Sequence, residues 1–385
     1  PPPGTSGVKS FSGQVSLDGT GIVIGGNTTI SNTSSNTTTT TTTAYVTTTT
    51  LPGSQGRLYF PKLINQNGKR TSLAVVNLGT VSTQLTFKAY SDNGQLLATG
   101  SSPYSLSPGK QYARLIGEIL PTFNQANGWL LLESSPVPSA LLKGFFLVFD
   151  DQLNVMDGAA VSDKTYSEFV LPTADDAEIY LANPSSSSVS YTLEYISEFG
   201  VVSGEKSGTI PAMGQIGATT TALRSGTGLT GYFRGRSSGT GVVAVAILNG
   251  NSQWTAALSG IDPSLYSTPT QLYAPQFVVN NDFTTTLDVI NLENRLNSVR
   301  LRLIGENGQQ TGFDALIPLP AGGSRRIEGC LIFGVTSAPN SYIQLSSSGK
   351  FTGSVRFTDP AASSIGSVLP LVGTGELKTT FSQVA

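Results

Sequence analysis

The chain has 385 residues, of which 38% are hydrophobic and only 12% are charged, and its formal net charge is −2. This near-neutral composition offers no basic footprint for nucleic acid and no polybasic patch for anionic lipid, so neither partner is expected. Histidine is absent and Cys330 is the only cysteine, which excludes the commonest general base, most zinc sites and any intrachain disulfide. No long apolar run is present, so the sequence predicts no transmembrane helix.

The first 56 residues differ in composition from the rest of the chain. Apolar residues separated by glycines predict one or two short strands that could pair with a neighbouring subunit. The candidate residues of this inter-subunit strand are Phe11, Val15, Leu17, Ile22 and Ile24. A Thr-rich, uncharged tract follows, which we expect to form an extended spacer with candidate O-glycosylation sites. It also holds three Asn-x-Ser/Thr sequons, which are candidate N-glycosylation sites: Asn27, Asn32 and Asn36.

An internal repeat occupies the remainder of the chain from about Leu58. In each copy an asparagine follows an apolar strand, and a glycine stands 17 residues farther on. The asparagines are Asn77, Asn183 and Asn291, and the glycines are Gly94, Gly200 and Gly308. A proline turn comes next, with Pro108, Pro211 and Pro320 placed in register, and then an aromatic residue opens a strand. These aromatic residues are Trp129, Tyr232 and Tyr342. Spacing kept at so many points indicates three copies of one structural unit.

The secondary structure is expected to be almost entirely strand. Short runs of Val, Ile, Leu, Phe and Tyr are separated by Asn-Gly pairs typical of hairpin turns, at residues 67–68, 93–94, 249–250 and 307–308. Residues 113–120 are the best helix candidate. Many short strands with frequent turns are typical of β-sandwiches. We therefore predict an all-β fold with three tandem Ig-like β-sandwich domains, preceded by the extended Thr-rich N-terminal segment.

The predicted divisions follow the repeat. They are residues 1–56 for the N-terminal strand segment and linker, 57–165, 166–268 and 269–375 for β-sandwich repeats one to three, and 376–385 for a C-terminal tail strand or the start of a further repeat. Each repeat is long enough to hold its own core, so each is expected to fold as a separate bead.

No group of residues points to catalysis. The sequence lacks a Gly-x-Ser-x-Gly elbow, a phosphate loop and the ligand spacing of a calcium loop, so we expect no enzyme activity, cofactor or metal site. The aligned asparagines are expected to satisfy backbone groups at strand ends, and the aligned aromatic residues to anchor each sandwich core. A sugar-binding alternative uses Tyr232 with Arg234 and Arg236 on one strand face.

The order of apolar strand, asparagine, polar loop, glycine turn, proline turn and aromatic strand is similar to the tandem β-sandwich repeats of secreted and cell-surface bacterial proteins. The similarity covers residues 58–373 and implies an extracellular or cell-surface location. We therefore expect a structural subunit of an extracellular filament or surface stalk, a homopolymer assembled by β-strand pairing through its terminal strands. The alternative is a cell-surface adhesin or carbohydrate-binding module with a glycan ligand.

Overall fold

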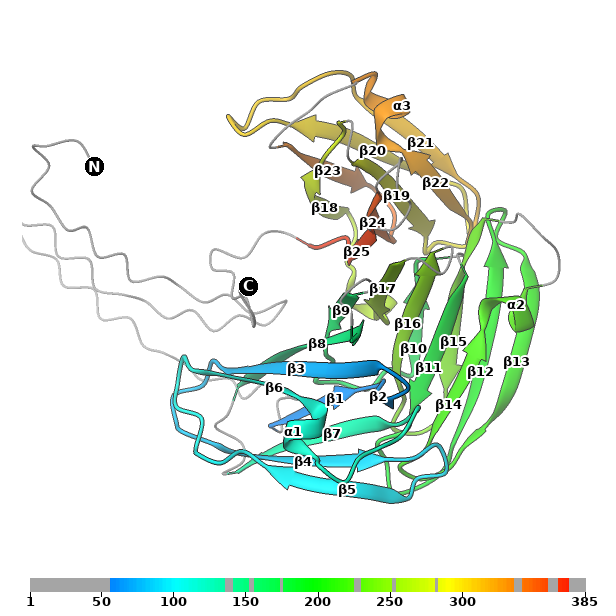
Figure 1. Cartoon of the computed structure of the whole chain (residues 1–385). Coiled ribbons are helices and arrows are strands. Elements are labelled where there is room, and N and C mark those ends of the chain that lie inside the picture. Colours follow the sequence, from blue (N-terminus) through cyan, green and yellow to red (C-terminus); the bar gives the residue numbers. More distant parts are fainter. Residues whose placement is uncertain are drawn as a thin grey trace, which may run out of the picture. The chain divides into compact units, whose positions relative to one another are not determined.

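The structure is a computed structural model that describes residues 56–135, 141–151, 156–173, 176–224, 230–250, 254–280, 283–335, 341–358 and 366–373. Nearly every regular element is a β-strand, so the predicted all-β class is confirmed (Figure 1). The strands form six sheets, two from each repeat. The candidate strand Phe11–Ile24, the sequons at Asn27, Asn32 and Asn36, and the tail 376–385 lie outside the described residues.

The first repeat forms a four-stranded and a five-stranded sheet. The four-stranded sheet has, in spatial order, β1 (Arg57–Phe60), β7 (Trp129–Ser135), β4 (Gln84–Tyr90) and β5 (Leu96–Ser101). The five-stranded sheet contains β2 (Asn65–Gln66), β3 (Lys69–Asn77), β6 (Gln111–Leu115), β8 (Leu142–Asp150) and β9 (Met156–Ala160). Helix α1 (Ile116–Ile119) connects β6 to β7 and lies within the predicted 113–120.

The second repeat forms two four-stranded sheets. The first has the order β10 (Glu168–Leu171), β15 (Gly231–Ser237), β12 (Val189–Ser197) and β13 (Val202–Ile210). The second has the order β14 (Gln215–Thr219), β11 (Ala177–Ala182), β16 (Val243–Gly250) and β17 (Trp254–Ser259). Helix α2 (Thr220–Leu223) precedes β15, and the 3-10 turn η1 (Pro263–Leu265) follows β17.

The third repeat has the same arrangement. Its first sheet has the order β18 (Thr270–Phe277), β23 (Ser341–Ser347), β20 (Asn297–Ile304) and β21 (Ala315–Leu319). Its second sheet has the order β22 (Ser324–Glu328), β19 (Thr284–Asn291), β24 (Phe351–Thr358) and β25 (Gly366–Pro370). Helix α3 (Gly329–Phe333) precedes β23, as α1 and α2 precede β7 and β15.

The strand order differs from that of immunoglobulin domains. In those domains the first strand pairs with the second. Here the first strand of each repeat pairs antiparallel with the strand that follows the short helix, so β1 pairs with β7, β10 with β15 and β18 with β23. The repeat is therefore an antiparallel sandwich with its own connectivity.

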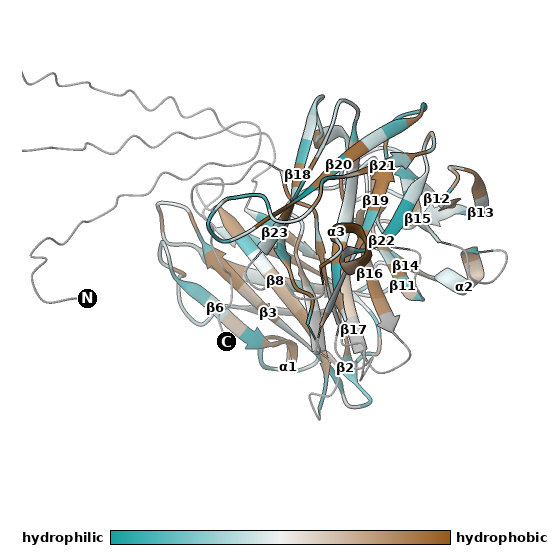
Figure 2. Cartoon of the chain, turned by 90° about the horizontal axis from the view of Figure 1, so that it is seen from above, coloured by the Kyte–Doolittle hydropathy of each residue, from teal (hydrophilic) through white to brown (hydrophobic). Residues whose placement is uncertain are grey.

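Apolar residues from the two sheets of each repeat form its core, with Phe87 and Phe146 in the first, Phe233 in the second and Leu301 in the third. Hydropathy colouring shows the apolar residues along β3 and β8 (Figure 2). The first core also contains Tyr180 of β11, whose strand neighbours face the second core. Apolar contacts therefore continue from one repeat to the next, within one compact unit that contains all the described residues. The count of three separately folding domains stays a prediction.

The predicted hairpin turns are largely present. Asn67 and Gly68 have positive φ angles of 56° and 72°, as a two-residue turn between paired strands requires, and Gly94 and Gly308 have φ angles of 83° and 75°. Residues 249–250 instead lie at the end of β16. Helices α2 and α3 were not predicted, because a single turn leaves no helical periodicity in the sequence.

Candidate functional site

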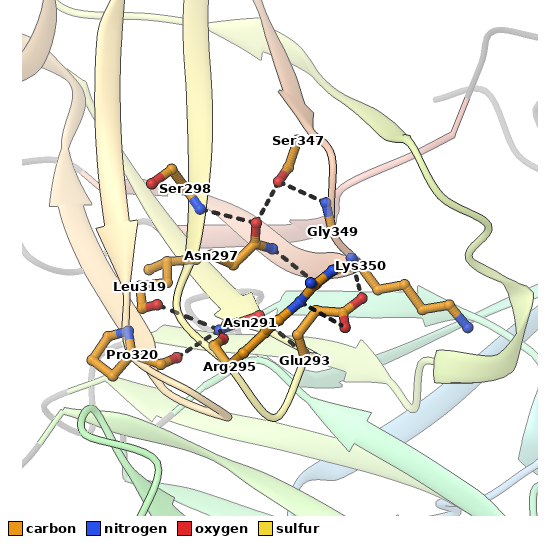
Figure 3. Close-up of polar contacts among 10 residues, drawn as sticks. All are labelled: Asn291, Glu293, Arg295, Asn297, Ser298, Leu319, Pro320, Ser347, Gly349 and Lys350. Atoms are coloured by element: carbon orange, nitrogen blue, oxygen red, sulfur yellow. Dashed lines mark hydrogen bonds and ion pairs between the residues drawn. The ribbon is translucent and has the colours of Figure 1, made fainter.

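The three aligned asparagines occupy one buried position, at or directly after the end of a central strand. Each is fully buried. Asn291 donates from Nδ2 to the carbonyls of Arg295 and Pro320, at 2.8 and 2.6 Å, and its Oδ1 accepts from the Glu293 N–H at 2.9 Å (Figure 3). Asn183 makes the three equivalent bonds, and Asn77 differs in one of them, since its Nδ2 donates to the Leu106 carbonyl, directly before the turn. Each asparagine thus ties its own loop to the tight turn farther along the repeat.

Those turns have the same backbone in all three repeats, with a left-handed residue at the third position: Gly109, Met213 and Gly322, at φ angles of 71°, 56° and 59°. The N–H of the next residue closes the turn on the carbonyl of Ser107, Pro211 and Pro320, respectively. Pro108 therefore lies one position later in its turn than Pro211 and Pro320. This corrects the sequence register, because backbone conformation rather than proline defines the equivalence.

The turns of the second and third repeats each receive a hydrogen bond from the preceding repeat. Trp129 Nε1 donates to the Met213 carbonyl at 2.8 Å, and the Tyr232 hydroxyl donates to the Gly322 carbonyl at 2.9 Å. Trp129 and Tyr232 are equivalent residues, and so are their acceptors. We call the contact between repeats one and two the first junction, and that between repeats two and three the second junction.

A second pair of equivalent bonds joins main chain to main chain. The N–H of Gln215 donates to the Asp92 carbonyl at 2.9 Å across the first junction, and the N–H of Ser324 donates to the Glu198 carbonyl at 3.0 Å across the second. Both acceptors lie in hairpin turns of the preceding repeat. The two junctions therefore share one backbone geometry.

The aligned glycines Gly94 and Gly200 are needed for this close approach. A Cβ at Gly94 would lie 2.0 Å from the Ala212 carbonyl oxygen, and one at Gly200 would lie 2.0 Å from that of Ala321. Both glycines also have positive φ angles. Only a residue without a side chain can meet both conditions without strain.

Apolar side chains complete each junction. At the first, Trp129 packs with Tyr59, Leu131 and Val243, and its ring stacks on Tyr90 at a centroid distance of 5.2 Å. The equivalent cluster at the second contains Val170, Ile196, Tyr232 and Ile290. Trp129 and Tyr232 were expected inside the sandwich cores. They lie between repeats instead, because alternate residues of β7 and β15 face outward. Burial at the second junction raises the pKa of Tyr232 to about 12.

A buried lysine belongs to the first junction. Lys62 Nζ donates to Asn127 Oδ1 at 2.7 Å and to the hydroxyl of Tyr180, which belongs to the second repeat, at 2.9 Å. The Tyr180 hydroxyl in turn donates to Glu178. Burial, opposed by the Glu178 and Asp92 charges, lowers the Lys62 pKa from 10.5 to about 8.

The outer face of the second sheet of repeat three carries a buried ion cluster. Asp288 is only 6% exposed and accepts from Arg326 Nε at 2.7 Å, while Arg356 Nη2 lies 3.6 Å from its other oxygen. Asp288 occupies the strand position equivalent to Tyr180. On the same sheet, Ser354 Oγ donates to the Pro172 carbonyl of repeat two at 2.9 Å. This face therefore contacts the preceding repeat, as the face with Tyr180 does.

An open cleft of about 520 Å³ lies at the second junction, between Glu168 and Arg234 on one side and Asn294 and Lys350 on the other. Arg234 is held by Glu194 at 2.8 Å, and Arg236 lies 3.6 Å from the same carboxylate. The proposed sugar-stacking ring, Tyr232, is only 2% exposed. Its face is thus not available for a sugar in this conformation.

Two further properties concern the described part of the chain alone. Its acidic residues and Cys330 form no group of three or more that could hold a metal ion. Its helices are too short to traverse a bilayer.

The sequence identified one half of each junction. It aligned Trp129 with Tyr232 and Gly94 with Gly200, and the structure brings these residues to the junctions. Tyr342 and Gly308 occupy the same positions in repeat three, where the described residues include no docked repeat. The receiving residues were missed, although the glycines at 214 and 323, each the last residue of a similar turn, were a signal for them.

No protein-family model matches this sequence, and no curated protein matches it. One similar solved structure is a β-glucuronidase of Bacteroides uniformis, with 10% identity, a TM-score of 0.13, and coverage of 59% of this chain and 26% of that chain. Another is a calcium-binding mutant of β-glucuronidase 2 from the same organism, with 9% identity, a TM-score of 0.14, and coverage of 60% and 26%. This chain spans about a quarter of either protein, and TM-scores this low carry no functional argument.

Proposed function

We propose that this chain is a non-enzymatic structural subunit of an extracellular filament or surface stalk. Neighbouring subunits join by β-strand pairing, with Phe11–Ile24 or the tail 376–385 as the donated strand. The Thr-rich tract between the donated strand and the first repeat serves as a spacer. The repeats themselves provide length, and no reactive group is assigned to turnover.

The main support for this proposal is that the first and second junctions have the same geometry. Both junctions place an aromatic donor, a glycine and a main-chain bond in the same arrangement, so successive repeats are fixed in one relation rather than loosely tethered. A fixed relation between units transmits tension, which a stalk or filament requires. The low charge of the chain adds little repulsion between units.

Sheet edges provide places for a donated strand. In the described part of the chain, β5, β13 and β21 each pair with a neighbour on one side only. An edge strand of this kind offers a row of N–H and C=O groups to an incoming strand. Pairing there gives a head-to-tail contact that can continue into a fibre.

Deletion of residues 1–26 tests the proposal. The full chain should form fibres or elongated particles in negative-stain electron microscopy, and the truncated chain should remain as folded monomers. A matched control replaces the same segment with a Gly/Ser stretch of equal length, which also should not assemble. Assembly that is unchanged by both alterations would rule out Phe11–Ile24 as the donated strand and leave the tail 376–385. A full chain that stays monomeric at all concentrations would count against the proposal as a whole.

A carbohydrate-binding role is the second candidate, and the cleft beside Arg234 and Lys350 favours it. Binding on a glycan array that is lost in Lys350→Ala, but kept in a control such as Lys206→Ala, would support this role. Lys206 is exposed and lies on the edge strand β13, so it tests for nonspecific charge effects.

A further inference from the structure

The third repeat presents the same surface that docks a following repeat at both junctions. We call this surface the outgoing face and define it by Tyr273, Ile304, Gly308 and Tyr342. Tyr342 is equivalent to Trp129 and Tyr232, because the strand partners Tyr90, Ile196 and Ile304 occupy one register position.

Burial shows that Tyr342 and Gly308 of this face are uncovered among the described residues, whereas Ile304 is 8% exposed. Trp129 and Tyr232 are 0% and 2% exposed, whereas Tyr342 is only half-buried and lies beside the ring of Tyr273, at a centroid distance of 6.1 Å. A Cβ at Gly308 would meet no described atom within 4 Å, although the same addition would collide with a carbonyl at Gly94 and Gly200.

The surface that docks onto an outgoing face also recurs. We call it the incoming face and define it in repeat one by Pro108, Gly109, Lys110 and Gln111. These four residues are exposed. At the junctions the residues equivalent to Gln111, which are Gln215 and Ser324, are 2% and 7% exposed.

One residue of this incoming face does not fit the shared geometry. Lys110 stands where the docked repeats have glycine. A Cβ at Gly214 would lie 2.7 Å from the Asp92 carbonyl oxygen, and one at Gly323 would lie 2.4 Å from that of Glu198. Both contacts are with backbone, which cannot move aside like a flexible side chain. Lys110 therefore excludes repeat one from docking in this way.

We propose that the outgoing face of the third repeat is a docking surface for a further β-sandwich repeat of the same construction, one with glycine at the position of Gly214 and Gly323. Lys110 makes the first repeat unable to act as that partner, so copies of this chain do not join through these two faces. The contact is heterologous, since different surfaces meet. It needs no terminal strand, so it is independent of the strand pairing proposed above.

The test converts the chain into its own partner. In the Lys110→Gly variant the incoming face of repeat one satisfies the glycine requirement, and Lys110 is exposed, so the substitution leaves the core intact. Self-association, measured by sedimentation velocity over a concentration series, should be about tenfold or more tighter than in the unaltered chain. Lys110→Ala, which removes the charge but keeps the Cβ, should behave like the unaltered chain.

Two additional variants locate the contact. Tyr342→Glu combined with Lys110→Gly should abolish the gained association, because the charge would be buried in the docked state. Leu331→Glu, a charge-matched change at a side chain that is 76% exposed on α3, should not. If Lys110→Gly associates no more than Lys110→Ala, or if the gain survives Tyr342→Glu, the inference is wrong. Assembly through residues 1–26 would be the same in all these variants, so either proposal can fail alone.

Discussion

The indole Nε1 of Trp129 donates a hydrogen bond to the carbonyl of Met213 at 2.8 Å, from the first repeat to a turn of the second. The hydroxyl of Tyr232 reaches the carbonyl of Gly322 at 2.9 Å in the same way. Two chemically different donors thus serve one purpose, because the acceptor is a main-chain atom held by the left-handed residue of a turn. The turn itself is held by a buried asparagine.

Tyr232→Phe removes only the hydroxyl that bonds to Gly322. The free energy of unfolding should fall by about 1 kcal/mol, since a half-buried carbonyl loses its donor while the ring packing stays. Tyr342→Phe is the matched control and should change stability by less than about 0.5 kcal/mol, because its hydroxyl has no acceptor across a junction. Urea denaturation of both variants measures the difference. Equal losses would show that the cross-junction bond contributes nothing.

Gly200→Ala and Gly308→Ala separate backbone strain from junction contact. Both glycines have positive φ, so both substitutions strain the turn. Only the Gly200 variant also forces a methyl group against the Ala321 carbonyl. It should lose about 1–3 kcal/mol more than Gly308→Ala, in the range of overpacked cores. Thermal or urea unfolding gives the comparison, and a smaller loss for Gly200→Ala would contradict the junction geometry.

Asn183→Ala should be among the most destabilising single substitutions. The side chain is fully buried, and its removal takes one donor from each of the carbonyls of Ser187 and Pro211 and removes the Oδ1 acceptor of the Ser185 N–H. We expect a loss of about 3 kcal/mol or more, because several hydrogen bonds of one buried side chain are lost together, each worth about 1 kcal/mol. Asn294→Ala, at an exposed loop position, should fall within about 0.5 kcal/mol of the unaltered chain. Similar small losses for both variants would refute the capping role.

Stability should rise with pH through the titration of Lys62. Its pKa is about 8 in the folded chain against 10.5 as the ordinary value, so between these values the unfolded chain binds more protons and unfolding becomes less favourable. From pH 7 to pH 9 the gain should be about 1 kcal/mol relative to Lys62→Met, which cannot titrate. Urea unfolding of both proteins at each pH cancels the other titrating groups. If the stability of both proteins changes with pH in the same way, the pKa of Lys62 is not lowered in the folded chain.

Much of this arrangement was predictable from the sequence. The spacing of Asn77, Asn183 and Asn291 gave the repeat, and the Asn-Gly pairs gave most turns, because both depend on local backbone chemistry. The location of Trp129 was not predictable. Alternation along β7 indicates two faces, but it does not tell whether the outward face meets water or another repeat. The turn register failed at Pro108 for a similar reason, since proline tolerates more than one position in such a turn.

The contacts of Lys62 were also not predictable from the sequence. Nothing near Lys62 in the sequence marks it as buried, because its partners Asn127 and Tyr180 are 65 and 118 residues away. Long-range contacts of this kind depend on how two repeats pack together, and local sequence patterns do not predict that packing.

Because the acceptors shared by both junctions are main-chain carbonyls, these bonds do not require neighbouring repeats to evolve matched side chains. A gene segment duplicated in place would encode a unit that already fits its neighbour, provided that the glycines are retained. The length of such a protein could then change by whole units between generations, while each unit drifts in sequence. The present chain, in which tryptophan and tyrosine fill the same role, is consistent with that kind of history.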